Sequence, residues 1–261
     1  MIPKKIHYMW FGGSPLPESA KKYMDSWRKF CPDYEIVRWD ESNFDIHCCK
    51  YVEEAYQARK WAFVSDYARF WVLFNVGGIY FDTDIEVVRS MNSLLEHKAF
   101  FGFGSTGLSL PVFGAQAGQP SYKDIVEDYN SRSFVLENGK LDLSPIDLTA
   151  LRILKSNYGL IVNNQFQTLN DGTVIYPKQY FHAFNTETGV MNLYPELFVI
   201  HYADGSWLND NQKYYIRLKK KCAKLLGGGK LSRSIAGIIY YYKTEGLFSM
   251  IKKCVSFLLR I

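Results

Sequence analysis

Residues 60–84, "KWAFVSDYARFWVLFNVGGIYFDTD", predict a helix that runs directly into a strand. The segment 60–76 is apolar on nearly every face, which is typical of a buried helix, and the following Gly-Gly pair would end it. Ile79–Phe81 then begin a strand, and Asp82 and Asp84 lie at the end of that strand. A helix joined so closely to a strand indicates an α/β layer arrangement.

The segments on either side of this unit extend the same pattern. "KKIHYMWFGG" predicts a strand over residues 5–10 that ends at a Gly-Gly turn, residues 16–30 predict an amphipathic helix, and "DYEIVRWD" predicts a second strand. Weaker patterns predict the remaining elements: extended structure at 85–88, strands at 99–103, 111–115 and 173–176, helices at 121–131 and 147–157, and a final core strand in "ELFVIHY" (196–202).

Composition limits the classes of protein that need to be considered. The 261 residues are 48% apolar and 16% aromatic, so the chain can bury a core and disorder is not expected. Five cysteines without CxxC or Cys/His spacing favour free cytosolic thiols over zinc or a disulfide framework. No apolar N-terminal segment and no run of eighteen apolar residues occurs, so we expect neither a standard export signal nor a membrane span.

The charge is distributed unevenly along the chain. Residues 213–261 hold twelve Lys or Arg and one acid, a net charge of +11, and the total is +5, so residues 1–212 carry 5 − 11 = −6. An acidic body followed by a basic tail predicts two parts, a domain over 1–212 and a helical extension over 213–261.

The two carboxylates of the D-T-D sequence are the first candidates for chemistry. Alternation along an extended chain would place Asp82 and Asp84 on one side and Thr83 on the other. Two like charges so close require a cationic partner, and hard oxygen donors of this kind hold Mg²⁺ or Mn²⁺. The alternative is an ordinary solvated turn that contains two acids.

Asp66 and Arg69 lie three positions apart and therefore on one face of the predicted buried helix. Either the two side chains form an internal ion pair in which each charge is neutralised only by the other, or both side chains reach a polar ligand in the same pocket as the D-T-D sequence. The short Gly-Gly connection favours the second interpretation.

Trp10 and His201 each have a functional interpretation beside a structural one. Trp10, at the end of a strand, could stack on a nucleobase or fill the core. In "HYADGSW" (201–207), His201 could complete a metal site or be a hydrogen-bonded core histidine, and Asp204, Ser206 and Trp207 make the segment polar.

Taken together and in this order, "IHYMWFGG", "AFVSDYARF", "GGIYFDTD" and "HYADGSW" resemble the DxD-containing sugar transferases of glycosyltransferase family 32. The family includes bacterial capsule and lipopolysaccharide enzymes and yeast mannosyltransferases, and its fold is similar to the catalytic domain of the clostridial glucosylating toxins. The resemblance covers residues 1 to about 90 strongly and 195–207 moderately. It implies a GT-A-like, Rossmann-like fold with a mixed central sheet.

The resemblance also implies roles for single residues on the donor side. Trp10 would stack on the base of the donor, Asp66 and Arg69 would hold the hydroxyls of the transferred sugar, and Tyr80 would line the same pocket. Ser206 and Trp207 would close over the diphosphate.

For the metal, the resemblance implies that Asp84 binds Mn²⁺, or Mg²⁺, directly. Asp82 would contact the ribose or reach the ion through water. His201 would be the late metal ligand, with Asp204 as a rival for that place.

The implied reaction is a retaining, metal-dependent transfer of a hexose from a UDP-sugar to a glycan or a lipid-linked oligosaccharide. Galactose, glucose and N-acetylhexosamine all remain open as the sugar, and residues from about 100 to 190 would shape the acceptor side. Two other functions stay open: a membrane-bound nucleotide-sugar sensor or scaffold without turnover, and a metal-dependent phosphohydrolase.

The tail predicts helices with basic and apolar faces at 216–226 and 246–261. Such helices bind anionic membrane surfaces, and we expect a protein held at the inner face of the cell membrane, in the synthesis of bacterial surface polysaccharides. A helical hairpin packed on the body is the structural alternative. The apolar stripe argues against nucleic acid as the partner.

Overall fold

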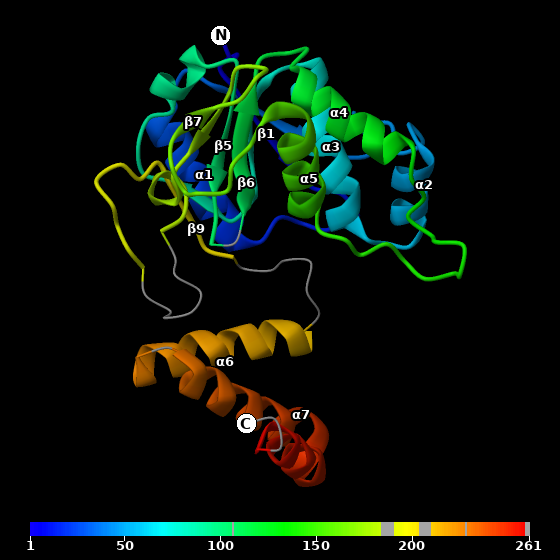
Figure 1. The fold of residues 1–261 in the computed structure, drawn as a ribbon, viewed down its shortest axis with the longest axis vertical. Helices are drawn as coiled ribbons and strands as arrows, with labels where there is room; N and C mark the ends of the chain where they lie inside the picture. The colour runs from blue at the N-terminus through cyan, green and yellow to red at the C-terminus, as the bar shows by residue number, and fades with distance from the viewer. Residues whose placement is uncertain (106, 184–190, 204–209, 228, 259–261) are drawn as a thin grey trace. The chain divides into compact units, whose positions relative to one another are not determined.

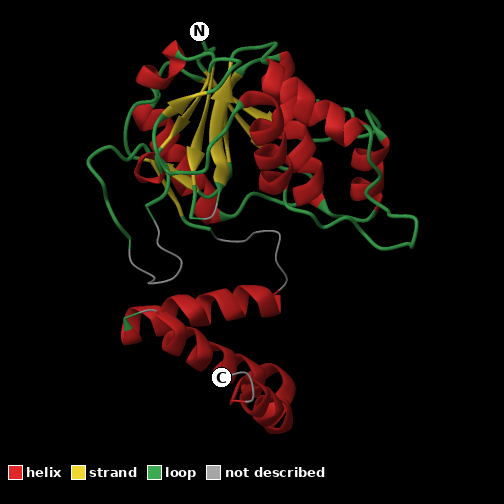
Figure 2. Ribbon diagram, in the orientation of Figure 1, coloured by secondary structure: helices red, strands yellow, loops and turns green. Residues whose placement is uncertain are grey.

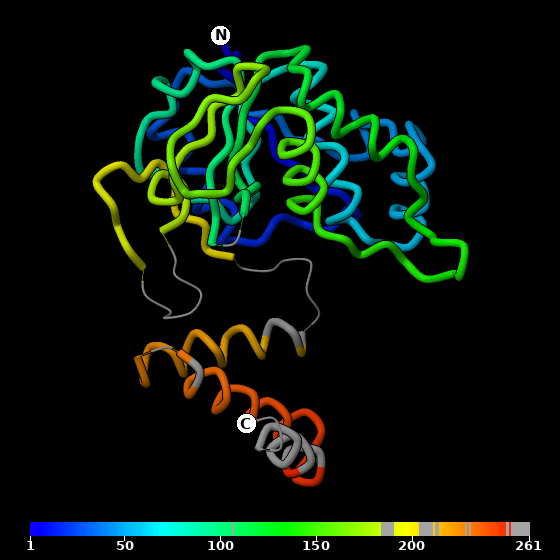
Figure 3. The backbone as a smooth tube through the Cα atoms, in the orientation of Figure 1, coloured from blue at the N-terminus to red at the C-terminus, as the bar shows by residue number. Residues whose placement is uncertain are grey.

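The computed structural model describes residues 1–105, 107–183, 191–203, 210–227 and 229–258 (Figure 1). The chain divides into two compact units, which are treated separately below. The first comprises Met1–Ala183 and Tyr194–Tyr202, and the second comprises Phe184–Leu193 and Ala203–Ile261. The first unit therefore takes its residues from two separate stretches of the chain, whose described parts Figure 3 draws as a tube coloured by residue number.

A seven-stranded sheet forms the centre of the first unit (Figure 2). Its order is β2-β1-β3-β6-β5-β8-β7. Strands β1–β2, β1–β3 and β5–β8 are parallel, and the other three pairs are antiparallel. The bounds are β1 Lys5–Met9, β2 Glu35–Trp39, β3 Gly78–Phe81, β5 Ala99–Phe103, β6 Leu108–Ala115, β7 Gln167–Thr168 and β8 Thr173–Tyr176. The mixed sheet that the sequence predicted is confirmed.

Helices cover both faces of this sheet. The bounds are α1 Glu18–Phe30, α2 Lys50–Gln57, α3 Trp61–Asn75, α4 Pro120–Asn130 and α5 Ile146–Tyr158, with short 3₁₀ turns at Asn92–Glu96 and Lys178–Tyr180. Alternating residues of β3 separate the two layers. Ile79 and Phe81 pack in the core that contains α1, whereas Tyr80 packs in the core formed with α2, α3, α4 and α5.

The junction between α3 and β3 is compact because of its two glycines. The amide of Gly77 donates to the carbonyl of Leu73 (3.0 Å) and closes the helix, with φ at +72°. A Cβ on this residue would lie 2.8 Å from the backbone nitrogen of Ala117, so the position has no room for a side chain. The Gly-Gly ending expected from the sequence is confirmed, and it holds the end of α3 against the start of β3.

His7 of β1 ties this junction to the sheet. Its Nδ1 accepts from Nε1 of Trp39 (2.9 Å), so its Nε2 carries the proton and donates to the carbonyl of Gly77 (2.9 Å). Burial lowers the pKa of His7 to about 4, which keeps the ring neutral.

Extended structure was expected at 85–88 and a final core strand at 196–202, and strands β4 (Ile85–Val87) and β9 (Val199–His201) lie there. These two strands do not join the central sheet. They pair with each other in a separate antiparallel sheet, with Ile85 opposite His201. The chain changes sheets because the amide of Ile85 bonds to the carbonyl of Asp82 (3.2 Å) and closes a turn.

The second unit contains a helical hairpin. Helices α6 (Asp210–Leu226) and α7 (Gly229–Leu258) pack against each other, and Gly246 interrupts α7 with φ at +85°. Within the described residues, no helix combines the length and the apolar character that crossing a membrane requires. The basic helix predicted at 216–226 lies within α6, and residues 246–258 of the one predicted at 246–261 lie within α7; residues 259–261 are outside the described residues.

Candidate metal and sugar-binding site

The D-T-D sequence lies in the turn between β3 and β4, not on an extended strand. The expected alternation of Asp82 and Asp84 on one side of a strand is therefore wrong as an explanation of their placement. The turn closed by Ile85 gathers the two carboxylates, since it folds residues 82–85 back on themselves. The amide of Asp82 still donates to the carbonyl of Pro111 (2.9 Å), which anchors the start of the turn to β6.

Strand β9 brings His201 to this turn. Ligand atoms of Asp82, Asp84 and His201 all lie within 4.8 Å of one another, and each residue is half-buried. Nε2 of His201 lies 3.3 Å from Oδ1 of Asp84. Two carboxylates and an imidazole at this spacing suit a divalent cation that accepts oxygen and nitrogen ligands, such as Mn²⁺.

Arg69 of α3 joins the acidic turn to the helix. Its Nη2 lies 3.0 Å from Oδ1 of Asp66, and its Nη1 lies 3.5 Å from Oδ1 of Asp82. The guanidinium also stacks on the ring of Tyr80, 4.5 Å from the ring centroid, and donates to the carbonyl of Leu110 (3.3 Å). The internal Asp66–Arg69 pair is therefore confirmed, and Arg69 also reaches the D-T-D turn. Binding of a polar ligand by both residues stays a prediction.

Tyr80 and Asp82 form a contact that the sequence did not predict. The Tyr80 hydroxyl donates to Oδ1 of Asp82 (2.5 Å), the same oxygen that faces Arg69. Asp82 therefore has one oxygen engaged by the protein and a second one available to a ligand. A residue spacing of two in a strand suggests such a contact, but the turn geometry that completes it is not visible in the sequence.

Burial shifts the protonation of these groups. Burial raises the pKa of Asp66 to about 6, although Arg69 opposes the shift, and Asp82 adds to it. Burial also raises the pKa of Asp82 and holds that of Tyr80 well above its ordinary value, so the phenol remains a donor. For Arg69, burial alone would lower the pKa, but Tyr80, Asp82 and Asp66 outweigh it and keep the guanidinium charged. Strong perturbation of this kind is common at functional sites.

Trp10 lies at the same edge of the sheet. Trp10 directly follows β1, which pairs in parallel with β3, so Trp10 and the D-T-D turn leave the sheet at the same end of these two strands. The indole is half-buried, and its Nε1 donates to the carbonyl of Ser14 (2.6 Å). The position fits a stacking role, with part of the ring accessible. Asp204, Ser206 and Trp207 lie outside the described residues.

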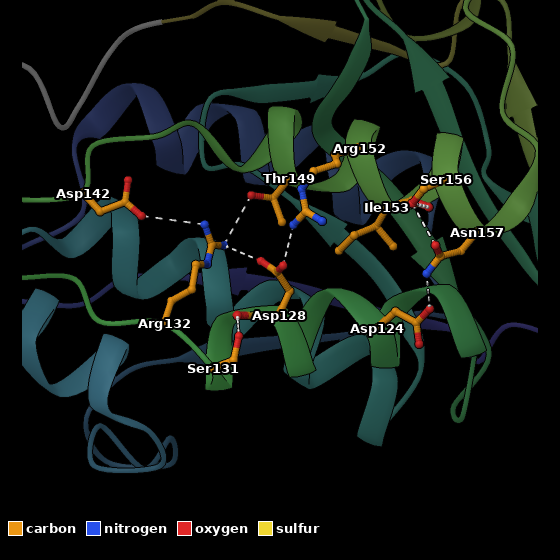
Figure 4. A network of polar contacts seen from close by, with 10 residues as sticks. All are labelled: Asp124, Asp128, Ser131, Arg132, Asp142, Thr149, Arg152, Ile153, Ser156 and Asn157. Carbon is orange, nitrogen blue, oxygen red and sulfur yellow. Dashed lines mark hydrogen bonds and ion pairs between the residues drawn. The ribbon is translucent and has the colours of Figure 1, made fainter. Parts of the chain in front are cut away.

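A second polar network joins α4, the loop after it and α5 (Figure 4). Arg132 lies 3.0 Å from Asp128 and 3.7 Å from Asp142, donates to the hydroxyl of Thr149 (3.3 Å), and stacks on Tyr129 at 3.9 Å from its centroid. It therefore fixes the connection between these helices. No sequence pattern predicted this network, because its members are spread over α4, the following loop and α5.

The family described as "Glycosyltransferase sugar-binding region containing DXD motif" matches residues 17–101. Helix α3, the Gly-Gly junction and the D-T-D turn all lie within this match, and His201 lies outside it. The match covers less than half of the 261-residue chain.

Three curated relatives come from Schizosaccharomyces pombe. Inositol phosphoceramide mannosyltransferase 3 is 31% identical over 136 residues, which are 49% of this chain and 37% of the relative. Inositol phosphoceramide mannosyltransferases 2 and 1 are 28% and 27% identical over 55% and 51% of this chain, and 46% and 45% of their own length. Less than half of each relative is therefore matched.

Solved structures with related arrangements include a galactosyltransferase, LgtC, in complex with donor and acceptor sugar analogues. It is 13% identical, with 87% of this chain and 97% of that chain covered and a TM-score of 0.45. The PaToxG glycosyltransferase is 19% identical, with 59% of this chain and 69% of that chain covered, and its TM-score is also 0.45.

Proposed function

We propose that this chain is a metal-dependent glycosyltransferase that moves a hexose from a nucleotide sugar to a glycan or a lipid-linked acceptor. The observation that carries the proposal is the meeting of Asp82, Asp84 and His201 beside the Asp66–Arg69 pair. Three of the elements that create this meeting, α3, β3 and the turn after it, lie in the segment that matches the sugar-binding DXD family.

Asp84 and His201 would hold the metal directly, and Asp82 would contribute its free oxygen to the ion, to its water or to the ribose. The donor set fits Mn²⁺ or Mg²⁺, with Mn²⁺ favoured by the imidazole. When bound, the ion would stabilise the negative charge that develops on the leaving diphosphate.

Asp66 and Arg69 would hold the transferred sugar. The Asp66 carboxylate accepts hydrogen bonds and the Arg69 guanidinium donates them, so together they can bind a pair of neighbouring hydroxyls. Both side chains are largely buried, with exposed fractions of 13% and 10%, and such hydrogen bonds are stronger where water is excluded. Trp10 would stack on the base of the nucleotide.

For the stereochemistry, we propose retention by attack on the same face from which the diphosphate leaves. Each carboxylate of the cluster already has a partner: Asp66 faces Arg69, Asp82 accepts from Tyr80, and Asp84 faces His201. None of them is placed as an unengaged nucleophile of the kind that retaining glycosidases use. The leaving phosphate would then take the proton of the acceptor hydroxyl. A glycosyl group trapped covalently on an Asp or Glu would contradict this mechanism.

The donor and acceptor are proposed more broadly. UDP-galactose, UDP-glucose and UDP-N-acetylhexosamines were expected from the sequence, and the names of the relatives, which are mannosyltransferases, add mannose. The same names specify a phosphoceramide acceptor, which supports testing lipid acceptors that carry a phosphate. A bacterial surface polysaccharide pathway stays a prediction from the motif resemblance.

The test is nucleotide release from a panel of UDP- and GDP-sugars, with Mn²⁺ and with EDTA. Many transferases hydrolyse their donor slowly, so no acceptor is needed. We expect one donor to be cleaved, only with metal, and Asp84→Ala to be slower by on the order of 10²-fold or more, since it removes a group that acts on the developing charge. Asp25→Ala, which changes an exposed acid on α1, is the matched control.

Two outcomes would replace the proposal. Donor binding without release, even with extracted lipid acceptors present, would favour the sensor or scaffold. Release of phosphate from simple phosphate esters, faster than release of nucleotide from any sugar donor, would favour a phosphohydrolase.

A further inference from the structure

The hairpin of the second unit uses small residues where its helices meet. Cys222 and Ala223 of α6 and Ser232 and Ala236 of α7 are buried, the last two at 1% and 0% exposure. The ring of Tyr240 in α7 lies tilted against the rings of Tyr214 and Tyr215 in α6, with its centroid 5.0 Å from that of Tyr215. Part of the apolar face predicted for α6 is therefore buried within the hairpin.

Large apolar side chains remain exposed outside this contact. Leu231, Ile238 and Tyr242 follow one another at helical spacings of seven and four, so they lie on one face of α7, and they are 65%, 40% and 56% exposed. Leu225 and Leu226 at the end of α6 are exposed as well. After the interruption at Gly246, α7 exposes three more: Leu247, Phe248 and Ile251, with Phe248 at 84%. So many exposed apolar side chains within one short hairpin indicate a surface that contacts an apolar environment.

Basic side chains accompany the exposed apolar ones. Arg217, Lys221 and Lys224 are exposed and follow one side of α6 at spacings of four and three. Over residues 213–261 the net charge is +11, and the only acid is Glu245. So many like charges repel one another in water, and a negatively charged surface relieves that repulsion.

We infer that the α6–α7 hairpin docks on an anionic lipid bilayer, with its basic side chains at the phosphates and its exposed apolar side chains in the headgroup boundary. Both features are needed, because lipid charge attracts the hairpin and apolar insertion retains it. The purpose of this docking rests on the proposed function, because a transferase whose acceptor is a lipid works at the leaflet that presents that lipid. Anionic lipids are enriched in the inner leaflet of the cell membrane.

The experiment is co-sedimentation of the full chain with vesicles. Vesicles of phosphatidylcholine with an equal part of phosphatidylglycerol are compared with vesicles of phosphatidylcholine alone. The wild type should sediment with the first and not with the second. Changing Arg217, Lys221 and Lys224 together to Gln should weaken partitioning roughly 100-fold, since each basic residue near the surface contributes a factor of about five.

Two matched controls separate this surface from general charge and hydrophobicity. Lys22, Lys60 and Lys140 are exposed on the first unit, and changing all three to Gln should leave partitioning unaltered. Phe248→Ser should weaken binding about tenfold, whereas Phe166→Ser, at a residue 55% exposed on the first unit, should not. Because the altered side chains are exposed, circular dichroism should report the same helix content in each variant.

The inference is overturned if the wild type ignores phosphatidylglycerol vesicles, which is the result expected of a hairpin packed on the first unit. It is also overturned if both triple variants lose binding equally, or if the hairpin prefers nucleic acid to vesicles. Asp84→Ala should bind vesicles as the wild type does. Vesicle binding without donor cleavage would therefore contradict the proposed function alone, and donor cleavage without vesicle binding would contradict this inference alone.

Discussion

Arg69 contacts more groups in the site than its helical spacing from Asp66 alone predicts. Its guanidinium faces two carboxylates, Asp66 and Asp82, lies on the ring of Tyr80, and donates to the carbonyls of Ser65 and Leu110. A planar group with five donors can satisfy these partners together, and an ammonium cannot.

We therefore expect Arg69→Lys to damage both the site and the fold. The variant loses the two hydrogen bonds to carbonyl groups and the contact with the Tyr80 ring. Its free energy of unfolding, measured by urea denaturation, should fall by about 1–3 kcal/mol. Donor hydrolysis should fall on the order of 10²-fold, because the Asp66–Arg69 pair that we propose holds the sugar is misplaced. Arg152→Lys is the control, since that exposed arginine also pairs with an aspartate, Asp128. Equal effects in the two variants would contradict the role given to Arg69.

His7 makes a separate prediction about pH. Its pKa falls from 6.5 in the unfolded chain to about 4 in the folded protein, so between these values the unfolded state binds more protons. Stability should therefore rise with pH across this window, and be lost as pH falls from about 6.5 to about 4, by roughly 3 kcal/mol in total. Protonation of Nδ1 would also set an N–H against the indole N–H of Trp39.

The measurement is urea denaturation of wild type and His7→Gln at about pH 7 and about pH 4.5. The pH-dependent difference between the two proteins belongs to His7. Asp66, whose pKa is raised to about 6, acts in the opposite direction but is present in both, so it cancels in the comparison. Parallel pH profiles would show that His7 is not the group responsible.

At the scale of elements, the α3–β3 junction sets the distance between Arg69 and the D-T-D turn. Gly77→Ala should destabilise the protein by several kcal/mol more than Gly118→Ala. Both residues have similar positive φ, +72° and +78°, but a Cβ at Gly77 meets backbone atoms at 2.8 Å, and one at Gly118 meets nothing within 4 Å. The control thus carries only the backbone strain of about 1 kcal/mol. Equal melting temperatures for the two variants would refute the packing argument.

The elements also show which parts of the fold the sequence could predict. Strands β5 and β8 have the predicted bounds, and α3 and α5 differ from theirs by one residue at each end, because apolar patterns and the turn residues that bound them report local structure well. Helix α2 and strand β7 were missed: one is eight residues long and the other two, too short for a periodic signal. The pairing of β4 with β9 was missed for a different reason, since the choice of a strand partner depends on residues far away in the chain.

The same limit applies to the candidate site. Helical spacing correctly predicted the Asp66–Arg69 contact, which needs only one element. The convergence of the D-T-D turn with His201 was suggested by the motif resemblance, but alternation gave the wrong reason for the placement of the two aspartates. The Tyr80–Asp82 bond and the Arg132 network were not anticipated, because each depends on how a turn or a long loop closes in three dimensions.

At the scale of the whole molecule, the change in net charge along the chain lies close to the start of the second compact unit. The change in composition predicted a boundary at residues 212 and 213, and the second compact unit takes up the chain from Ala203 onward together with Phe184–Leu193. Composition cannot reveal that the two units alternate along the chain, because the returning segment Tyr194–Tyr202 is too short to have a composition of its own.

That returning segment governs when the cluster can exist. Both aspartates are made early, but His201 is the last of the three groups to be synthesised, after the whole seven-stranded sheet. A nascent chain that has folded this sheet on the ribosome still lacks its imidazole, and so does any fragment cut by a protease before β9. Prematurely terminated or clipped copies therefore keep both acids but not the complete three-residue cluster.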